Sequence, residues 1–393
     1  MIKDKNILVG VSGSIAAYKA CELVRHLQKK GAKIRVVMTP SAKEFVGELT
    51  FRALTNYHVL SDWKDGETGL EHIYWARWAD SFVIAPASAN TIAKIKAGIA
   101  DNFLTTLALA YDKPIVFAPA MNTKMYENPA NKENIETLKK WGHIFVSPEE
   151  GKLTCGEEGT GKLANIEAIE AGVLYSLTDK PLKGKKVLIT AGGTREFFDP
   201  IRYISNASSG KMGYSIAKMA HVLGAKQVIL ISAPTCLDKP YGVHKIDVVS
   251  ADDMYQQVMK YAKDMDVIIM NAAVADFKPA VHSNKKLKKS TESTTVELKP
   301  NPDILEELGK IKKENQILIG FAAESENLEK NARDKLKRKN LDAIVVNKVD
   351  VFSKDYHKGK IIFKDGKCIE IPLMDKEESA YFILKSIIGE ING

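Results

Sequence analysis

The chain has 393 residues, more than one hydrophobic core usually covers, so two domains are expected. Its 45% hydrophobic and 27% charged residues are typical of a globular protein, and no apolar run reaches the roughly 18 residues that span a bilayer. The N-terminal stretch "MIKDKNILVG" lacks a signal-peptide core, so we expect a cytoplasmic protein without membrane association.

The charge balance alone does not identify a partner. Lys and Arg number 57 against 49 Asp and Glu, which gives a formal net charge of +8. This excess suits phosphorylated small molecules as much as nucleic acid. The cysteines contain no C-x-x-C pair, which argues against a disulfide framework and a structural zinc site: Cys21, Cys155, Cys236 and Cys368. The sequence identifies no metal ligands.

The first predicted unit opens with a strand, a helix and a second strand. "KNILVG" is a short apolar strand, a Gly/Ser turn starts an amphipathic helix that stops at Gly31, and the second strand ends at Thr39-Pro40. The turn reads "GVSGS" rather than G-x-G-x-x-G, and no acid follows the second strand, which disfavours an NAD(P) dehydrogenase. Ser12 and Ser14 favour a bound phosphate at the helix start, but a plain turn with Ser14 as N-cap explains the same residues.

A lone histidine occurs in the next predicted helix, "GLEHIYWARWADS". His72 has Trp75 and Trp78 three and six residues further on. A histidine among aromatic residues is more often a packed residue than a catalyst, so both roles remain open.

A second polar helix start follows in "VIAPASANT". A predicted strand runs into Pro86, and Ser88, Asn90 and Thr91 begin the next helix. Since the carboxyl ends of parallel strands share one edge of a sheet, this helix start and the first one would converge. Two hydroxyl-rich helix starts together suit one phosphate monoester.

The stretch "PAMNTKMYENP" shows neither a helical nor a strand period. Pro119 and Pro129 restrict its two ends, so a stiff loop is expected. Cys155 follows in "EEGKLTCGEEGTGKL", whose glycines predict a mobile loop that closes over a substrate. A free thiol on a surface loop is the alternative.

The second half repeats the strand, turn and helix order in "KKVLITAGGTRE" and "SSGKMGYSIAKMAHVLGAKQVILIS". The Pro- and Gly-containing stretch 176–186 separates the halves, and we place the boundary near residue 182. The prediction is an α/β protein with two doubly wound, Rossmann-like domains and mostly parallel sheets, with a first domain 1–178, a linker 179–186 and a second domain 187–393. Taken alone, the lysines of "NKKLKKS" form a solvated loop or a nonspecific polyanion-binding patch.

Nearly the whole chain resembles two known families. The Gly/Ser turn, "PASANT", "LEHIYWARWAD" and "PAMNTKMYENP" are similar to motifs of the homo-oligomeric flavin-containing cysteine decarboxylases. "RYISNASSGKMG", "NAAVADF", "KLKK", "KPNPDIL" and "GFAAE" resemble phosphopantothenate–cysteine ligases. Together they resemble the bifunctional family of coenzyme A biosynthesis. The resemblance implies an FMN-dependent decarboxylase of phosphopantothenoylcysteine and a ligase that joins 4'-phosphopantothenate to cysteine through an acyl-cytidylate, using CTP and Mg²⁺.

For the decarboxylase half, the resemblance implies that His72 is the base or orienting group and that Cys155 protonates the enethiol. Asn122 would bind the substrate carboxylate between Met121 and Met125. The implied FMN-binding residues are Gly10, Ser12, Gly13, Ser14, Thr39, Ser88, Asn90, Thr91 and Thr105. Three positions depart from the family pattern: Tyr126 stands for Trp, Glu157 for Asp and Lys162 for Arg. Lysine lacks the fork of arginine, so the Cys155 loop must be anchored differently.

For the ligase half, the resemblance makes Lys286 and Asn206 catalytic, with Arg202 beside the acyl-cytidylate and Ser208, Ser209 and Gly210 at the substrate phosphate. The implied CTP-binding residues are Ala272, Ala273, Asp276, Lys286, Pro302, Asp303, Ile304, Leu305, Phe321, Lys335 and Lys339. An ordinary charged helix surface is the alternative for the last two lysines.

The resemblance also implies a homo-oligomer, in which decarboxylase trimers joined by ligase dimers form a dodecamer, without a nucleic-acid partner. A flavin-binding regulatory or scaffold protein of the same fold, without turnover, is the alternative. That alternative predicts no function for His72, for Cys155 or for the lysines of "NKKLKKS".

Overall fold

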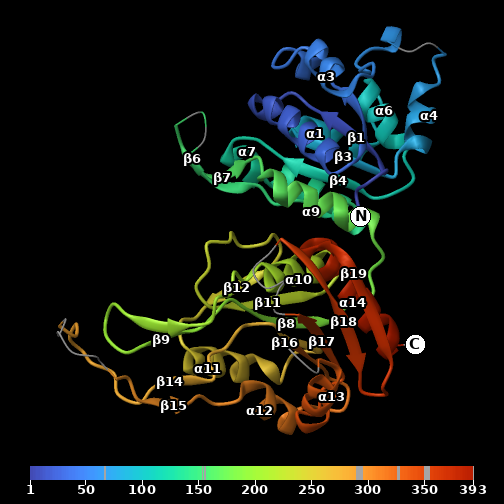
Figure 1. Cartoon of the computed structure of the whole chain (residues 1–393). Coiled ribbons are helices and arrows are strands. Elements are labelled where there is room, and N and C mark those ends of the chain that lie inside the picture. The colour runs from blue at the N-terminus through green and yellow to red at the C-terminus, as the bar shows by residue number, and fades with distance from the viewer. Residues whose placement is uncertain are drawn as a thin grey trace. The chain divides into compact units, whose positions relative to one another are not determined.

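The computed structural model describes residues 1–65, 68–152, 154, 156–288, 295–324, 328–348 and 355–392. The chain divides into two compact units, Met1–Thr178 and Asp179–Gly393 (Figure 1). Each unit is an α/β structure with its own hydrophobic core and its own main sheet, which confirms the predicted fold class. Among the described residues, no helix is long and apolar enough to cross a membrane.

Unit 1 is built on a five-stranded parallel sheet in the order β2-β1-β3-β4-β5. The strands are β1 (Asn6–Val11), β2 (Lys33–Met38), β3 (Ser81–Ala87), β4 (Ile115–Pro119), β5 (Ile144–Phe145), β6 (Glu149–Lys152) and β7 (Glu158–Lys162). The helices are η1 (Ile15–Tyr18), α1 (Lys19–Lys29), α2 (Pro40–Lys43), α3 (Glu48–Thr55), η2 (Trp63–Asp65), α4 (Glu71–Trp78), α5 (Ala89–Ala97), α6 (Phe103–Ala110), α7 (Thr123–Glu127), α8 (Pro129–Lys140) and α9 (Ile166–Leu177).

Helices cover both faces of the unit 1 sheet. α1 and α9 pack on one face, and α4, α5, α6 and α8 pack on the other around Phe82 and Phe117. The chain moves from β1 to β2 on one side and then to β3 on the other, so the strand order reverses between β1 and β3. Ligands of doubly wound sheets bind beyond the carboxyl ends of the strands at such a point.

Two segments of unit 1 differ from expectation. The "PAMNTKMYENP" stretch is not a loop, because α7 occupies its middle and Pro129 is the first residue of α8. Asn122 and Asn128 cap these helices with their side chains, and five residues are too few for a helical period to appear in the sequence. Tyr126, the residue that replaces Trp, packs against the core of the unit.

The residues around Cys155 form an antiparallel hairpin of β6 and β7 rather than a simple loop. Its glycines permit close packing: a Cβ on Gly161 would lie 2.2 Å from the Met121 carbonyl oxygen, and one on Gly159 would lie 2.5 Å from Thr123 Oγ1. The Met121 N–H donates to the Gly161 carbonyl at 3.0 Å, so the hairpin docks on the residues that precede α7. Cys155 itself lies outside the described residues.

Unit 2 contains an eight-stranded sheet in the order β12-β11-β8-β13-β16-β17-β18-β19, parallel except for β18 and β19. The strands are β8 (Lys186–Ala191), β9 (Arg195–Phe197), β10 (Tyr203–Ser205), β11 (Gln227–Ser232), β12 (His244–Asp247), β13 (Val267–Met270), β14 (Phe277–Pro279), β15 (Leu298–Pro300), β16 (Ile317–Glu324), β17 (Ala343–Lys348), β18 (Tyr356–Phe363) and β19 (Cys368–Asp375). The helices are α10 (Lys211–Val222), α11 (Ala251–Ala262), α12 (Ile304–Ile311), α13 (Leu328–Arg338) and α14 (Lys376–Asn392).

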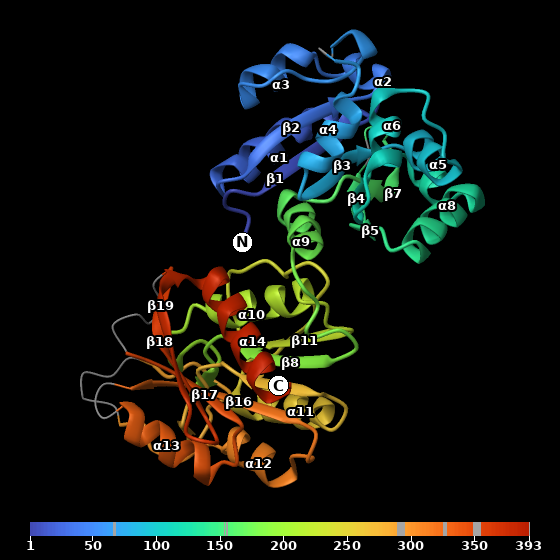
Figure 2. The same ribbon diagram turned by 90° about the vertical axis from the view of Figure 1, so that its right-hand side faces the viewer.

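α11, α12 and α13 cover one face of this sheet, and α10 and α14 pack together on the other (Figure 2). The strand order reverses between β8 and β13, which again places a ligand-binding edge at the carboxyl ends of the parallel strands. The stretch between α9 and β8 packs on unit 2, since Leu182 is buried and its N–H donates to the Leu223 carbonyl at 3.1 Å.

Candidate active sites

A cavity of about 770 Å³ opens at the carboxyl ends of β1 to β4 in unit 1. Each strand contributes the residues that follow it, because the parallel strands all end at this edge. Among the residues predicted for the flavin and the substrate, those that line the cavity are Gly13, Ser14, Thr39, Ser88, Asn90, Thr91, Met121, Asn122 and Met125. The structure therefore brings together residues more than 100 positions apart in the sequence.

Three capped helix starts meet at this cavity. Ser14 caps η1, Thr39 caps α2 and Ser88 caps α5, each with its side-chain oxygen accepting from a backbone N–H. The sequence predicted the first and third of these starts to converge, and Thr39 adds another. A helix start presents N–H groups without backbone partners and favours an anion.

Three other predicted residues lie behind the cavity wall and do not line it. Ser12 Oγ donates to the Pro86 carbonyl and accepts from the Ser88 N–H, both at 2.8 Å, and so joins the turn after β1 to the end of β3. A Cβ on Gly10 would lie 3.1 Å from the side chains of Leu104 and Phe82. Thr105 is buried and completes the capping box that starts α6.

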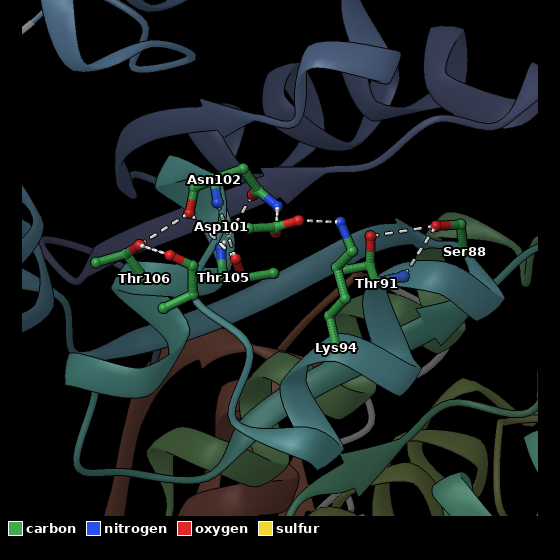
Figure 3. A network of polar contacts seen from close by, with 8 residues as sticks. Ser88, Thr91, Lys94, Asp101, Asn102, Thr105 and Thr106 are labelled. Atoms are coloured by element: carbon green, nitrogen blue, oxygen red, sulfur yellow. Dashed lines mark hydrogen bonds and ion pairs between the residues drawn. The ribbon is translucent and has the colours of Figure 1, made fainter.

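A polar network beside the cavity holds α5 and α6 (Figure 3). Lys94 Nζ contacts Asp101 Oδ2 at 2.5 Å, and Asn102 Nδ2 donates to Asp101 Oδ1 at 2.9 Å. The hydrogen bond from Lys94 is the main cause of the lowered pKa of Asp101. All three residues line the cavity, and the sequence did not single them out.

The lining residues fit a flavin mononucleotide. A Cβ on Gly13 would lie 2.6 Å from Ser41 Cβ, so only glycine lets the first turn pass this close to the start of α2. The capped helix starts suit a phosphate, while Met121 and Met125 offer apolar, polarizable surface to a ring.

Asn122 lies where the docked hairpin meets the cavity. Its Oδ1 accepts from the Lys124 N–H at 2.8 Å, and its Nδ2 donates to Glu157 Oε2 at 2.9 Å. The two departures from the family pattern that lie in the hairpin region therefore have defined contacts: Glu157 binds Asn122, and Lys162 Nζ lies 3.5 Å from Glu149 Oε2 across the hairpin.

His72 does not line the cavity of its own chain. It lies in the predicted helix, α4, edge-on to Trp63 and Phe103 with ring centroids 5.6 and 6.3 Å away. Its Nδ1 atom is buried without a hydrogen-bond partner in the described part of the chain.

In unit 2, the lysine-rich stretch that contains Lys285, Lys286 and Lys288 is anchored through the backbone of Leu287. The fully buried Asp199 carboxylate accepts from the backbone N–H groups of Ile201, Arg202 and Leu287 at 2.9, 2.8 and 3.2 Å, and it pairs with Arg202 Nη2 at 2.9 Å. Arg202 Nη2 also donates to the Leu287 carbonyl.

Burial opposes ionisation of Asp199, but these donors and Arg202 prevail and lower its pKa. Lys285, Lys286 and Lys288 are exposed on either side of the anchor, and Lys289 lies outside the described residues. Neither Asp199 nor its link to the lysines was predicted from the sequence.

Two further contacts join residues predicted for the ligase. Asn206 Nδ2 donates to the carbonyls of Ala273 and Val274 at 3.3 and 3.2 Å. Asp303, which caps α12, pairs with the buried Lys339 Nζ at 2.6 Å, and this pairing contributes to the lowered pKa of Asp303 alongside the opposing effect of burial.

Other predicted nucleotide residues surround these contacts. Asp276 and Pro302 are held close together, because the Asn301 N–H donates to the Asp276 carbonyl at 2.8 Å. Ile304 and Leu305 begin α12, Phe321 lies in β16, Ala272 follows β13, and Lys335 lies in α13. In the described part of the chain, no group of three His, Cys, Asp or Glu side chains is arranged to hold a metal ion.

A second cavity, of about 70 Å³, lies at the start of α10. Four of its lining residues were predicted: Ser208, Ser209, Gly210 and Phe321. The others were not predicted as site residues, although the first three stand in motifs of the ligase resemblance: Lys211, Met212, Asn271, Asn347, His357 and Lys376.

Comparisons with known proteins match both units. Residues 1–178 match the family described as Flavoprotein, and residues 182–390 match the DNA/pantothenate metabolism flavoprotein C-terminal domain. The coenzyme A biosynthesis bifunctional protein CoaBC of Bacillus subtilis is 46% identical over 98% of this chain and 97% of its own. The CoaBC protein of Escherichia coli is 38% identical over the same shares.

Solved structures match each half separately. The C-terminal domain of a CoaBC protein is 44% identical and covers 55% of this chain and 99% of that chain, with a TM-score of 0.47. A PPC decarboxylase mutant complexed with pantothenoylaminoethenethiol is 35% identical and covers 44% of this chain and 97% of that chain, with a TM-score of 0.40.

Proposed function

Because this chain belongs to the family of coenzyme A biosynthesis bifunctional proteins, we propose that unit 2 joins 4'-phosphopantothenate to cysteine and that unit 1 decarboxylates the product to 4'-phosphopantetheine. The protein is a flavoprotein enzyme with ligase and decarboxylase activities. The observation that carries the proposal is the convergence of three capped helix starts and Asn122 on one cavity of unit 1. A scaffold protein without turnover is not favoured by this family membership.

In unit 1, Ser14, Thr39 and Ser88 would hold the FMN phosphate at the helix starts, with Asn90 and Thr91 beside them. Bound FMN would supply a two-electron acceptor next to the carbon that carries sulfur, which makes loss of CO2 feasible, and it would return the two electrons when the enethiol is converted to the thiol of the product. Asn122 donates its amide N–H to the substrate carboxylate, and Met121 and Met125 exclude water from it.

Cys155 and His72 complete the proposed decarboxylase site. Cys155 protonates the enethiol carbon after CO2 has left. Since His72 does not line the cavity of its own chain, we propose that it serves the cavity of a neighbouring subunit in a trimer. Trimers of unit 1 joined by dimers of unit 2 would form a dodecamer, and the mass of the native particle measured by light scattering would then equal twelve chains.

In unit 2, a carboxylate oxygen of 4'-phosphopantothenate would attack the α-phosphorus of CTP, and pyrophosphate would leave. The cysteine amine would then attack the acyl carbon, with CMP as the leaving group. Lys286 would stabilise the charge on the phosphates, and Asn206 and Arg202 would orient the acyl-cytidylate. Mg²⁺ is the proposed ion for the triphosphate.

One assay tests both activities. Purified protein is incubated with 4'-phosphopantothenate, cysteine, Mg²⁺ and CTP, and mass spectrometry follows phosphopantothenoylcysteine and 4'-phosphopantetheine. We expect both products. Lys286→Gln should abolish amide formation, and Cys155→Ser should stop the reaction after CO2 loss. Absence of the amide from the unmodified protein would overturn the ligase assignment.

A further inference from the structure

We propose that Glu157 is an internal competitor of the decarboxylase substrate: its carboxylate occupies the amide donor of Asn122, and the substrate carboxylate must displace it. This inference rests on the proposed role of Asn122 in binding the substrate carboxylate. It assigns a function to a residue that departs from the family pattern, in which an aspartate stands at this position.

The hydrogen bonds of Asn122 fix which end of its amide faces Glu157. Its Oδ1 accepts from the Lys124 N–H at 2.8 Å and caps α7, so the amide presents Nδ2 to the hairpin. Nδ2 donates to Glu157 Oε2 at 2.9 Å, a normal length for a hydrogen bond from nitrogen to a carboxylate. The contact is therefore the one that a substrate carboxylate would make with the same atom.

Packing of the hairpin holds Glu157 close to Asn122. β7 begins directly after Glu157 and packs on α7 (Figure 1). The Met121 N–H donates to the Gly161 carbonyl at 3.0 Å, so β7 also contacts the residue before Asn122. Glutamate carries its carboxylate one methylene further from the backbone than the aspartate of the family pattern. This longer reach is what the contact with Asn122 uses.

The contact lies at the protein surface, where a ligand can exchange it. The side chain of Glu157 is 47% exposed, and its Oε1 lies 3.7 Å from the Nζ of Lys124, whose side chain is 84% exposed. Ion pairs with this exposure contribute little to stability, so their displacement costs little. Lys124 also offers the displaced carboxylate a second partner.

Two carboxylates cannot share the Asn122 donor without a penalty. Both would place a negative charge beside the same amide nitrogen, and like charges at such short separation repel each other. Binding of the substrate carboxylate to Asn122 therefore favours release of Glu157. When CO2 has left, the repulsion is gone and Glu157 returns to the donor.

The competition affects ligands according to whether they carry a carboxylate. The apparent affinity for the substrate is reduced by the fraction of molecules in which Glu157 occupies Asn122. 4'-Phosphopantetheine lacks the carboxylate and leaves the contact in place, so its binding should not depend on Glu157. This difference separates competition from a purely structural role of Glu157 in holding the hairpin.

The test compares Glu157→Gln with Glu158→Gln, which removes the same charge from the neighbouring exposed residue. Calorimetry with the flavin-loaded full chain would measure binding of phosphopantothenoylserine, which carries the carboxylate but has no thiol to be oxidised, and of 4'-phosphopantetheine. Glu157→Gln should bind phosphopantothenoylserine about 3- to 10-fold more tightly than the unmodified protein, the effect of removing one exposed ionic contact. Its affinity for 4'-phosphopantetheine should be unchanged.

Glu157→Ala, which also removes the acceptor oxygens, should tighten binding of phosphopantothenoylserine at least as much, and Glu158→Gln should change neither affinity. Weaker binding of both ligands by Glu157→Gln would mean that Glu157 only anchors the hairpin and would overturn the inference. Unchanged binding of phosphopantothenoylserine, or equal tightening by Glu158→Gln, would overturn it as well. Failure of the unmodified protein to decarboxylate phosphopantothenoylcysteine would instead overturn the proposed function.

Discussion

Asn122 illustrates how one side chain can shape both the fold and the chemistry of the decarboxylase unit. Its carbonyl oxygen caps α7, and its amide nitrogen donates to Glu157 from the hairpin. The carboxylate of Glu157 is thus bound in the way that we propose for the substrate carboxylate. The two functions of Asn122 reside on different atoms, so they can be separated by substitution.

Asn122→Asp should remove the donor while retaining the cap, since aspartate caps helices as well as asparagine does. A carboxylate at this position would also repel both Glu157 and the substrate. We expect decarboxylation to fall about 10- to 100-fold, the effect of losing a hydrogen bond to a charged group, with the thermal unfolding midpoint nearly unchanged. CO2 release measured with purified phosphopantothenoylcysteine is the readout. Unimpaired turnover would contradict the assignment of Asn122.

Asp199 has a comparable role in unit 2, where it holds the backbone of Leu287 between the exposed lysines. Asp199→Asn keeps the size of the side chain but loses its charge and the ion pair with Arg202. Ligase activity should fall about tenfold because Lys286 is no longer held in place, while decarboxylase activity should be unaffected. Asp238→Asn, at an exposed site, is the control. An equal loss of both activities would point to general unfolding instead.

The lowered pKa of Asp199 also predicts the direction of a pH effect. The carboxylate contributes its full stabilisation above the pKa of an ordinary aspartate, and this contribution is lost as the pH falls through the lower pKa of the folded state. The anchor of the lysine-rich stretch should therefore persist at neutral pH.

The strands and helices differ in how far local sequence specifies them. The β1, α1 and β2 segment and the starts of η1 and α5 were predicted, because apolar periods and Ser caps act over a few residues. The short helix α7 and the β6–β7 hairpin were not, because one is too short to show a period and the other is defined by its packing on residues 121 to 123.

The same distinction applies to the sites. Hydroxyl side chains at helix starts were found because each follows its strand directly. Asp199, His357 and Lys376 were missed, because their significance depends on partners far away in the sequence, such as Leu287 and the start of α10. The burial of His357, and the lack of a partner for its Nε2 among the described residues, become apparent only once β18 pairs with β17 and β19.

The turn that connects α9 to β8 contains Lys180, a partly buried lysine whose charge should affect stability in a pH-dependent way. Burial lowers the pKa of Lys180 to about 8, from an ordinary value of 10.5. Between these two pH values the unfolded chain binds more protons than the folded one, so the free energy of unfolding should rise with pH. Below pH 8 the charged lysine destabilises the fold.

Lys180→Met should therefore stabilise unit 2 at pH 7, by about 1 kcal/mol after allowance for partial solvent screening, and the gain should shrink as the pH approaches 10.5. Hydrogen exchange of the amides in β8 and β11 would measure it. Lys183→Met changes an exposed lysine in the same turn and should have little effect at either pH. A gain that is independent of pH would mean that packing, rather than charge, is responsible.

For the molecule as a whole, the division after Thr178 separates two complete sheets. Each main sheet has helices on both faces and its own core, so each half contains the contacts that its fold needs. We therefore propose that the two activities reside on separable halves of the chain.

Expression of residues 1–178 and 179–393 as separate proteins tests this proposal. The first should be yellow with bound flavin and should decarboxylate added phosphopantothenoylcysteine, and the second should form the amide. Mixing the two should restore the complete conversion of 4'-phosphopantothenate. An insoluble fragment would contradict the proposed division, and loss of activity in a folded fragment would show that its site needs the other half.

The order of the two units along the chain has a consequence for how the protein is made. A ribosome that has synthesised residue 178 has already made every residue named above for the flavin cavity, whereas unit 2 is not complete until β18 and α14 have been made. A premature stop codon between residues 300 and 350 would thus yield a polypeptide that binds flavin and decarboxylates phosphopantothenoylcysteine when it is supplied. The same polypeptide would be unable to synthesise phosphopantothenoylcysteine itself.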